Sequence, residues 1–295
     1  MMRGKIGKYI GMLVVAFSLS GCLQPSPPSS SEGEKVLPAI TKEDTHKHYQ
    51  GKFVWHDLLT NDVASAQTFY AGLFGWSFQK RDNYVLVMNH GERIGGMVNI
   101  ASPRGEKVTA IWLPSISVAD VDEAAEYLVR KKGKVLKGPM DMKKRGRGAL
   151  VRDPYGAFVV LLHSKSGDPL DTTPKIGDWL WNELWSNSPS QSYSFYRALG
   201  GYDKEADTEK DYLILKQKGV WRAGIRYVEE DAFDVQWVPV VRVSDPEAIV
   251  AKTPELGGRV LMKPQATLMN GDVALIADPS GALLIVQRWK EGDME

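Results

Sequence analysis

The residue that this 295-residue sequence most clearly lacks is cysteine, because Cys22 is its only one. A single thiol excludes disulfide bonds within the chain and metal sites built from several cysteines. The 37 basic and 36 acidic residues nearly cancel, and no nucleic-acid-binding motif is present, so we expect no nucleic-acid partner. The short motifs of serine hydrolases, phosphate-binding loops and zinc proteases are also missing. What remains is an ordinary globular composition, with enough apolar residues to bury a core.

The first 22 residues predict export and lipid attachment. Basic residues at positions 3, 5 and 8 precede an apolar run at 10–19, which is about half the ~20 residues that a membrane-spanning helix needs. The sequence Leu-Ser-Gly-Cys at 19–22 then resembles the lipobox of bacterial lipoproteins. We therefore predict a lipoprotein signal peptide over residues 1–21 and lipidation of Cys22. The alternative is an ordinary secretory signal with an incidental cysteine.

Residues 22–50 contain little that a folded core could bury. A Pro- and Ser-rich stretch is followed by charged residues, which is typical of a disordered tether. The predicted partner is therefore membrane lipid, bound through Cys22, and the predicted location is the cell envelope. Leu23 stands where an acidic residue would indicate inner-membrane retention in a Gram-negative cell. In such a host we favour the outer membrane, with the protein facing the periplasm.

An internal repeat covers most of the remaining chain. Residues 55–76, WHDLLTNDVASAQTFYAGLFGW, match residues 181–202, WNELWSNSPSQSYSFYRALGGY, at a lag of 181 − 55 = 126 positions. The sequence Asp-Pro-Tyr-Gly at 153–156 matches Asp-Pro-Ser-Gly at 278–281, at a lag of 278 − 153 = 125. A nearly constant lag predicts two tandem domains of the same architecture.

Each domain is predicted to contain a β-α-β-β-β plan twice. In domain 1 a short aromatic-rich strand at 53–59 is followed by Asp62, a good helix N-cap, and by apolar residues at helical spacing up to Gly75. Strands follow, and the second half of the domain repeats the plan. The predicted fold class is therefore α+β, with domain 1 at 51–165, a linker at 166–177 and domain 2 at 178–290.

This order of landmarks resembles the vicinal oxygen chelate superfamily, which includes glyoxalase I, the bleomycin-resistance proteins and the extradiol dioxygenases. The landmarks are the first strand, Asp62, the aromatic and glycine positions at 69–76, the helix start at 118–124 and the turn at 153–156. The resemblance implies that two β-α-β-β-β units in each domain pair into a cupped, barrel-like sheet. It also implies that a ligand or metal binds on the concave face.

The positions that the resemblance assigns to metal ligands carry apolar side chains, which donate no lone pair to a divalent cation. They are Trp55, Leu113 and Val160 in domain 1, and Trp181, Val238 and Ile285 in domain 2. We therefore predict no metal cofactor. The alternative is a divalent metal at a displaced site that includes His56 and Asp57. Because strand side chains alternate, Trp55 and Asp57 should face the cup and His56 should point behind it, unless a bulge reverses them.

The same alternation defines the candidate ligand site. The first strand of each domain has a tryptophan two residues before an acid, so aromatic rings and a carboxylate should line each cup. The predicted ligand-binding residues are Trp55, Asp57, Trp181, Glu183 and Trp185. The competing interpretation is that these side chains fill the cups as ordinary packing. The basic run at 143–147 is expected to be a solvated loop, with an anion or lipid headgroups as the alternative.

The residues support three functional hypotheses. The first, which we favour, is a lipid-anchored protein that binds a small apolar or aromatic molecule rather than acting as an enzyme. The second is a lyase or dioxygenase that uses the displaced metal site. The third is an envelope interaction protein whose cups are filled by their own side chains. No catalytic residue is predicted, and the fold alone does not choose among the three.

Overall fold

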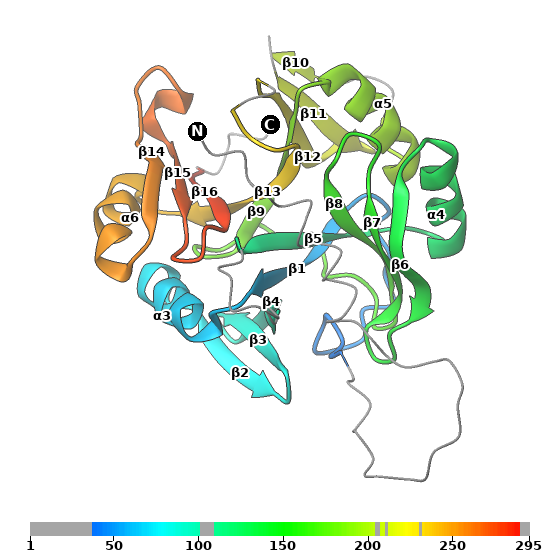
Figure 1. Ribbon diagram of the computed structural model, residues 1–295, viewed down its shortest axis with the longest axis horizontal. Coiled ribbons are helices and arrows are strands. Elements are labelled where there is room, and N and C mark those ends of the chain that lie inside the picture. The colour runs from blue at the N-terminus through cyan, green and yellow to red at the C-terminus, as the bar shows by residue number, and fades with distance from the viewer. Residues whose placement is uncertain (1–36, 101–108, 204–206, 210–211, 230–231, 290–295) are drawn as a thin grey trace.

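A computed structural model describes residues 37–100, 109–203, 207–209, 212–229 and 232–289 (Figure 1). The predicted signal peptide, Cys22 and the tether up to residue 36 lie outside the described residues. Among the helices that are described, none is both long and apolar enough to cross a membrane.

Domain 1 is one eight-stranded sheet built from two β-α-β-β-β units. Its elements are β1 (Phe53–Thr60), α3 (Val63–Phe74), β2 (Ser77–Arg81), β3 (Tyr84–Asn89), β4 (Glu92–Asn99), β5 (Ile111–Ser117), α4 (Val121–Arg130), β6 (Lys134–Asp141), β7 (Gly146–Arg152) and β8 (Phe158–Ser164). The strand order is β2-β3-β4-β1-β5-β8-β7-β6. The two units join where β1 pairs antiparallel with β5.

Domain 2 repeats this topology in a second eight-stranded sheet of order β10-β11-β12-β9-β13-β16-β15-β14. Its elements are β9 (Trp179–Ser186), α5 (Pro189–Gly200), β10 (Asp207–Glu209), β11 (Tyr212–Gln217), β12 (Val220–Tyr227), β13 (Gln236–Val243), α6 (Pro246–Lys252), β14 (Arg259–Met262), β15 (Val273–Ala277) and β16 (Leu283–Arg288). Two short 3₁₀ helices, η2 (Pro254–Leu256) and η3 (Met269–Gly271), flank β14. The predicted α+β class is confirmed.

The predicted limits of the first helix are confirmed by its caps. The Asp62 carboxylate accepts a hydrogen bond from the backbone N–H of Ser65 at 3.0 Å. Gly75 ends the helix at φ +70°, in the left-handed region that favours glycine. The strand β2 has no sequence-based counterpart, because four of its five residues are exposed and it shows no apolar alternation.

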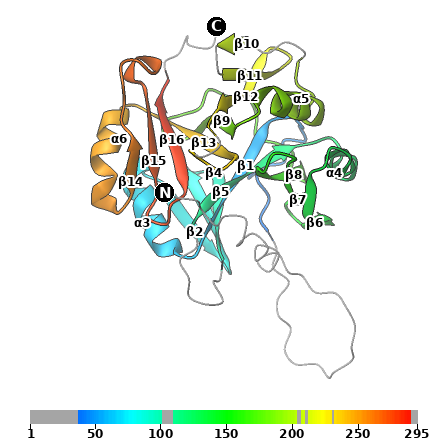
Figure 2. The same ribbon diagram turned by 45° about the horizontal axis from the view of Figure 1, so that its top comes forward.

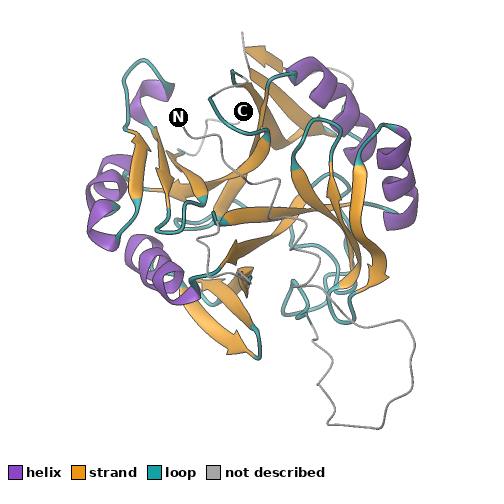
Figure 3. Ribbon diagram, viewed as in Figure 1, coloured by secondary structure: helices purple, strands orange, loops and turns teal. Residues whose placement is uncertain are grey.

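The helices lie on two opposite flanks of the molecule and join the domains (Figure 3). On one flank an apolar cluster combines Leu128 of α4 with Tyr196 of α5. On the other flank a second cluster combines Phe69 of α3 with Val250 of α6. Figure 2 shows the same pairs of helices side by side after rotation. Each half of domain 1 therefore shares its helix-side core with one half of domain 2.

Two reciprocal hydrogen bonds cross between the domains. The hydroxyl of Tyr70 donates to the Asp278 carboxylate at 3.1 Å, and the hydroxyl of Tyr196 donates to Asp153 at 2.8 Å. Both acceptors are the aspartates of the repeated Asp-Pro-x-Gly turns. Burial raises the pKa of both carboxyls, although hydrogen bonds from the tyrosines and from backbone N–H groups oppose the shift. The interface therefore has approximate twofold symmetry.

Residues 37–50, which we call the strap, correct one expectation. The sequence predicts a disordered tether there, but Ile40 is only 1% exposed and packs in an apolar cluster of domain 1. The hydroxyl of Thr45 donates to the backbone oxygen of Asp168 at 2.8 Å, across 123 positions of sequence. The prediction of disorder is wrong for these residues, because distant parts of the chain bury Ile40 and satisfy backbone and side-chain polar groups of the strap.

The described contacts all lie between residues 37 and 289. Both sheets and the apolar clusters are built from residues in this range. A chain that begins at Leu23 therefore retains every contact described here, whereas a chain that begins near Gln50 would lose the strap.

Candidate functional site

Cup 1 is the face of the domain 1 sheet that turns away from α3 and α4, and it contains Trp55 and Asp57 as the alternation of β1 predicts. Both side chains are buried, at 1% and 5% exposure. The indole Nε1 of Trp55 lies 3.1 Å from Asp57 Oδ1 and 3.0 Å from the hydroxyl of Tyr84. Tyr84 in turn donates to Asp57 Oδ1 at 2.5 Å. The carboxylate of cup 1 is therefore already hydrogen-bonded within its own domain.

Arg145 completes the polar floor of cup 1, which corrects the expectation of a solvated basic run. Its side chain is 2% exposed, and its Nη1 lies 3.5 Å from Asp57 Oδ2. Its Nη2 donates to the Tyr84 hydroxyl at 3.0 Å, and its guanidinium carbon is 4.6 Å from the centre of the Trp55 ring. Asp57 supplies the opposite charge that a buried guanidinium requires.

The strap covers this floor. Nε of Arg145 donates to the carbonyl of Pro38 at 2.8 Å. Arg93 on β4 donates to the carbonyls of Ala39 at 3.1 Å and Thr41 at 3.0 Å. Between these contacts Ile40 inserts into the apolar cluster that contains Trp55. Trp55 and Asp57 therefore lie in a filled cup, as the packing interpretation predicts for this domain.

His56 points behind the sheet, as the alternation predicts, and faces domain 2. Its Nε2 lies 2.9 Å from Oδ1 of Asn182, the equivalent residue of β9, and its ring packs on Trp179 at 4.2 Å between centroids. Burial lowers the pKa of His56 to about 4, and the contact with Asn182 offsets only part of this shift. The register of β1 does shift between Phe53 and Trp55, but this irregularity does not bring His56 into the cup. His56 and Asp57 therefore lie on opposite faces and do not form a common metal site.

Cup 2 is the equivalent face of domain 2 and brings together Glu183 and Trp185 of β9. Arg226 on β12 donates to both oxygens of the Glu183 carboxylate, at 2.7 and 3.1 Å. The indole of Trp185 donates to Oε1 of Glu183 at 2.8 Å. In contrast to Arg145 of cup 1, the Arg226 side chain is 35% exposed. The floor of cup 2 therefore also carries an acid–arginine pair, but this pair reaches solvent.

Trp181 stands beside this pair, half-buried among aromatic rings. It stacks on Trp221 of β12 at 5.8 Å and packs on Tyr212 of β11 at 6.1 Å between centroids. Its indole nitrogen is buried and has no hydrogen-bond partner among the described residues. The equivalent nitrogen of Trp55 in cup 1 contacts both Asp57 and Tyr84. Cup 2 therefore presents a donor that its own domain leaves unsatisfied.

Tyr84 and Tyr212 are site residues of the two cups that strand alternation does not single out, although the sequence carries a signal for them. Each hydroxyl passes directly over a glycine of the neighbouring strand. A Cβ placed on Gly96 would lie 1.8 Å from the Tyr84 hydroxyl, and one on Gly224 would lie 1.8 Å from the Tyr212 hydroxyl. The spacings agree, since 212 − 84 and 224 − 96 are both 128. A repeated Tyr and Gly pair at one lag therefore marks these positions.

A cleft of about 270 Å³ lies at the junction of the two domains, beside cup 2. Phe233, which packs edge-on against Trp185 at 4.5 Å between centroids, is one of its lining residues. None of the five predicted ligand-binding residues lines it. Phe233 therefore contacts a residue of cup 2 and also lines this cleft.

Residues 47–161 match the family model of the Glyoxalase/Bleomycin resistance protein/Dioxygenase superfamily. The match covers domain 1 and confirms there the resemblance seen in the sequence. The putative glyoxylase CFP32 of Mycobacterium tuberculosis is 28% identical over 251 residues, which cover 81% of this chain and 95% of that protein. The anthracycline biosynthesis protein DauV of Streptomyces sp. strain C5 is 28% identical over 264 residues, which cover 82% and 94%.

Solved structures of other members of the superfamily share the fold. The Mn(II)-bound glyoxalase of Novosphingobium aromaticivorans superposes with a TM-score of 0.57 at 12% identity and covers 82% of each chain. The 2,2',3-trihydroxybiphenyl 1,2-dioxygenase of Sphingomonas wittichii strain RW1 superposes with a TM-score of 0.55 at 12% identity, over 81% of this chain and 91% of the dioxygenase. At such low identity the likeness confirms the predicted architecture of two tandem cupped domains and nothing finer.

The residues at the superfamily's usual metal positions do not fit a metal in either cup. They belong to or pack against the apolar clusters of the two cups: Trp55, Leu113, Val160, Trp181, Val238 and Ile285. The described part of the chain contains no group of three or more His, Cys, Asp or Glu side chains that could hold a metal ion. The carboxylates that do face the cups, Asp57 and Glu183, are paired with arginines. The available donors thus lack the convergence that a divalent cation requires.

Proposed function

We propose that this protein is a membrane-anchored binding member of the superfamily that holds a small planar aromatic molecule in cup 2 without a metal. The predicted ligand-binding residues of that cup are Trp181, Glu183 and Trp185. Trp221, Tyr212 and Arg226 join them in space.

The observation that carries this proposal is the unsatisfied indole N–H of Trp181 among stacked rings. Leaving a buried donor unpaired costs about 1–3 kcal/mol, which an acceptor on a bound ligand would offset. Trp181 and Trp221 place two aromatic rings side by side, and stacking on such rings favours a flat aromatic ligand. A carbonyl or quinone oxygen on such a ligand would accept from Trp181. The ligand class is therefore a planar aromatic that bears a carbonyl group.

The similarity to DauV supports the same ligand class. That protein is named for anthracycline biosynthesis, and anthracyclines are planar polycyclic aromatics with quinone carbonyls. The lyase or dioxygenase hypothesis has less support, because His56 and Asp57 face opposite sides of β1 and no other donor set converges in the described residues.

The anchor in this proposal is lipid on Cys22, in the outer membrane facing the periplasm if the host is Gram-negative. The support is the Leu-Ser-Gly-Cys sequence at 19–22 and the presence of a single cysteine. Palmitate labelling of the full chain in cells tests it. Label that persists in a Cys22→Ser variant would contradict the anchor.

The binding site is tested with the chain that begins at Leu23, by calorimetry and by quenching of tryptophan fluorescence. The probes are anthraquinone-2-sulfonate and anthracene-2-sulfonate, which share shape and charge but differ in the carbonyl groups. We expect saturable binding that is about fivefold to tenfold tighter for the anthraquinone, because only its carbonyl satisfies Trp181.

Trp181→Phe keeps an aromatic ring but removes the donor, so it should abolish this preference. Trp55→Phe is the matched control in the filled cup and should leave the affinity of the anthraquinone unchanged. Equal affinity for the two probes, or a loss caused by Trp55→Phe, would contradict a site in cup 2. A stoichiometric transition metal in the purified chain would contradict the metal-free mode.

A further inference from the structure

Cup 1 is filled by the chain's own backbone. We define residues 37–41 as the plug. Three of its carbonyl oxygens, those of Pro38, Ala39 and Thr41, accept hydrogen bonds from two guanidinium groups. Ile40 places an apolar side chain, 1% exposed, between these contacts. The plug thus presents oxygen acceptors around an apolar body, which is also the pattern of a small organic acid.

The charges of cup 1 favour an anion over a neutral group in this place. Arg145 is paired with Asp57. Arg93, by contrast, donates its described hydrogen bonds to carbonyls of the plug and forms no ion pair with a carboxylate among the described residues. A guanidinium binds a carboxylate more strongly than it binds a carbonyl, because both groups are charged and the fork of donors matches two oxygens. The carbonyls of the plug are therefore weaker partners for Arg93 than a ligand carboxylate.

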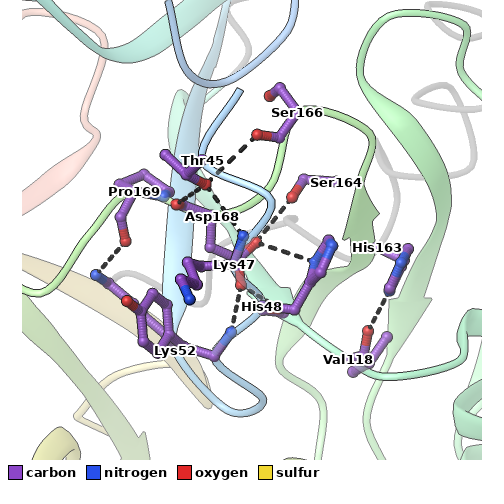
Figure 4. A network of polar contacts seen from close by, with 12 residues as sticks. Thr45, Lys47, His48, Lys52, Val118, His163, Ser164, Ser166, Asp168 and Pro169 are labelled. Atoms are coloured by element: carbon purple, nitrogen blue, oxygen red, sulfur yellow. Dashed lines mark hydrogen bonds and ion pairs between the residues drawn. The ribbon is translucent and has the colours of Figure 1, made fainter. Parts of the chain in front are cut away.

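The plug and the rest of the strap are attached to domain 1 at two separate places. Figure 4 shows the second attachment, where Asp168 is fully buried. Its carboxylate accepts from the backbone N–H of Tyr49 at 2.7 Å and from the hydroxyls of Ser117 at 2.6 Å and Ser164 at 2.8 Å. Between this anchor and the plug, residues 42–44 are exposed. Among the described residues, the side chains of this segment form one ion pair, the exposed pair of Lys42 with Glu92, which contributes little. Residues 42–44 therefore form a weakly held connection between the plug and the anchor.

We infer that residues 37–41 form a hinged plug that occupies, in cis, a second binding site in cup 1 for a small carboxylate with an apolar body. The carboxylate replaces the carbonyls of Ala39 and Thr41 at Arg93, and the apolar body replaces Ile40. This site is separate from cup 2, so it does not depend on the proposed function.

The test opens the plug in the chain that begins at Leu23. Ile40→Gly removes the buried side chain, and Ile176→Gly makes the same change on the linker, where the isoleucine is 46% exposed. Each variant and the parent are titrated calorimetrically with 2-naphthoate and with its neutral isostere 2-naphthamide. We expect Ile40→Gly to gain a site that the parent and Ile176→Gly lack, with a preference for the acid on the order of tenfold. Adding Arg93→Gln should remove most of this preference, whereas binding common to all variants belongs to cup 2.

A folded Ile40→Gly variant that gains no site would overturn the inference, as would a gained site that accepts the amide equally or ignores Arg93→Gln. If Ile40→Gly fails to fold, thiol labelling of an Ile40→Cys variant decides, because the chain that begins at Leu23 has no other cysteine. Its thiol should be modified at least about tenfold faster than that of a Leu59→Cys control, a position fully buried in the same apolar cluster. Equal labelling rates would show that the plug does not open separately.

Discussion

The two cups of this molecule have the same topology and the same tryptophan and acid on their first strand, yet they are closed to different degrees. In cup 1 the pairing arginine is Arg145, from the loop before β7, and it is buried under the strap. In cup 2 the pairing arginine is Arg226, from β12, and it reaches solvent. Asn270 occupies the position equivalent to Arg145 at a lag of 125, and Val98 the position equivalent to Arg226 at a lag of 128. The two arginines therefore stand at non-equivalent positions and reach the acid from opposite sides of the cup.

In both cups the acid on the first strand requires an arginine as its partner. The element that carries this arginine determines how far solvent reaches into the cup. An arginine that enters from the loop before β7 lies across the cup and binds the strap. An arginine on β12 lies along the sheet and leaves the ring of Trp181 partly exposed. The following substitutions use this contrast, from the largest expected effect to the smallest.

The first comparison is between Arg145→Met and Arg226→Met. Removing Arg145 leaves the Asp57 charge buried without its partner, so we expect a loss of about 3–5 kcal/mol in the free energy of unfolding. Removing Arg226 leaves Glu183 with a path to water, so its loss should be nearer 1 kcal/mol. Urea unfolding of the chain that begins at Leu23 measures both losses. Equal losses would mean that the two pairs are buried to the same extent.

The second comparison concerns His56 and its symmetry-related partner Asn182. Because the pKa of His56 is about 4 in the folded protein and about 6.5 when unfolded, the unfolded state binds an extra proton between these values. Stability should therefore fall as the pH is lowered from 6.5 to 4, by about 3 kcal/mol in total, and level off below pH 4. His56→Asn places the same residue on both sides and should remove this component. The check is a series of urea titrations across this pH range, and an unchanged pH slope in the variant would contradict it.

The third comparison tests whether the interface between domains is symmetric where the cups are not. Tyr70→Phe and Tyr196→Phe each remove a hydrogen bond to a buried turn aspartate and one accepted from a buried indole, so each should cost at least about 1–3 kcal/mol. The two losses should agree within about 0.5 kcal/mol, since the partners and the burial are equivalent. Thermal or urea unfolding under the same conditions measures them. Losses that differ by more than about 0.5 kcal/mol would show that the interface between the domains is asymmetric, as the cups are.

Much of the fold follows from local patterns in the sequence. The repeat predicts two domains, the alternation on β1 predicts which side of the strand Trp55 and His56 face, and Asp62 predicts the start of a helix. The last two features depend on neighbours within a few residues, and the repeat emerges when the chain is compared with itself at a lag of about 125 positions. The strand β2 is the exception, because an exposed edge strand of polar residues lacks the alternation by which strands are recognised.

The candidate site is less predictable because its decisive contacts join distant residues. Arg145 reads as one member of a charged run, and only the fold shows that it turns inward beside Gly146, whose φ is +113°. The strap has no helical or strand periodicity, and it is held by partners more than 50 positions away. The pairing of a strand acid with an arginine from elsewhere depends on tertiary structure, which spacing along the chain does not reveal.

The reciprocal bonds of Tyr70 with Asp278 and of Tyr196 with Asp153 also bear on how the sequence of such a chain can evolve. Each domain binds a turn of the other domain. Replacing one domain alone with an unrelated sequence would leave a buried carboxylate without its tyrosine and the shared apolar core without half of its side chains. The two domains must therefore be kept together as a pair. Within that pair the concave faces, which make no such bonds across the interface, are the part that duplication leaves free to diverge.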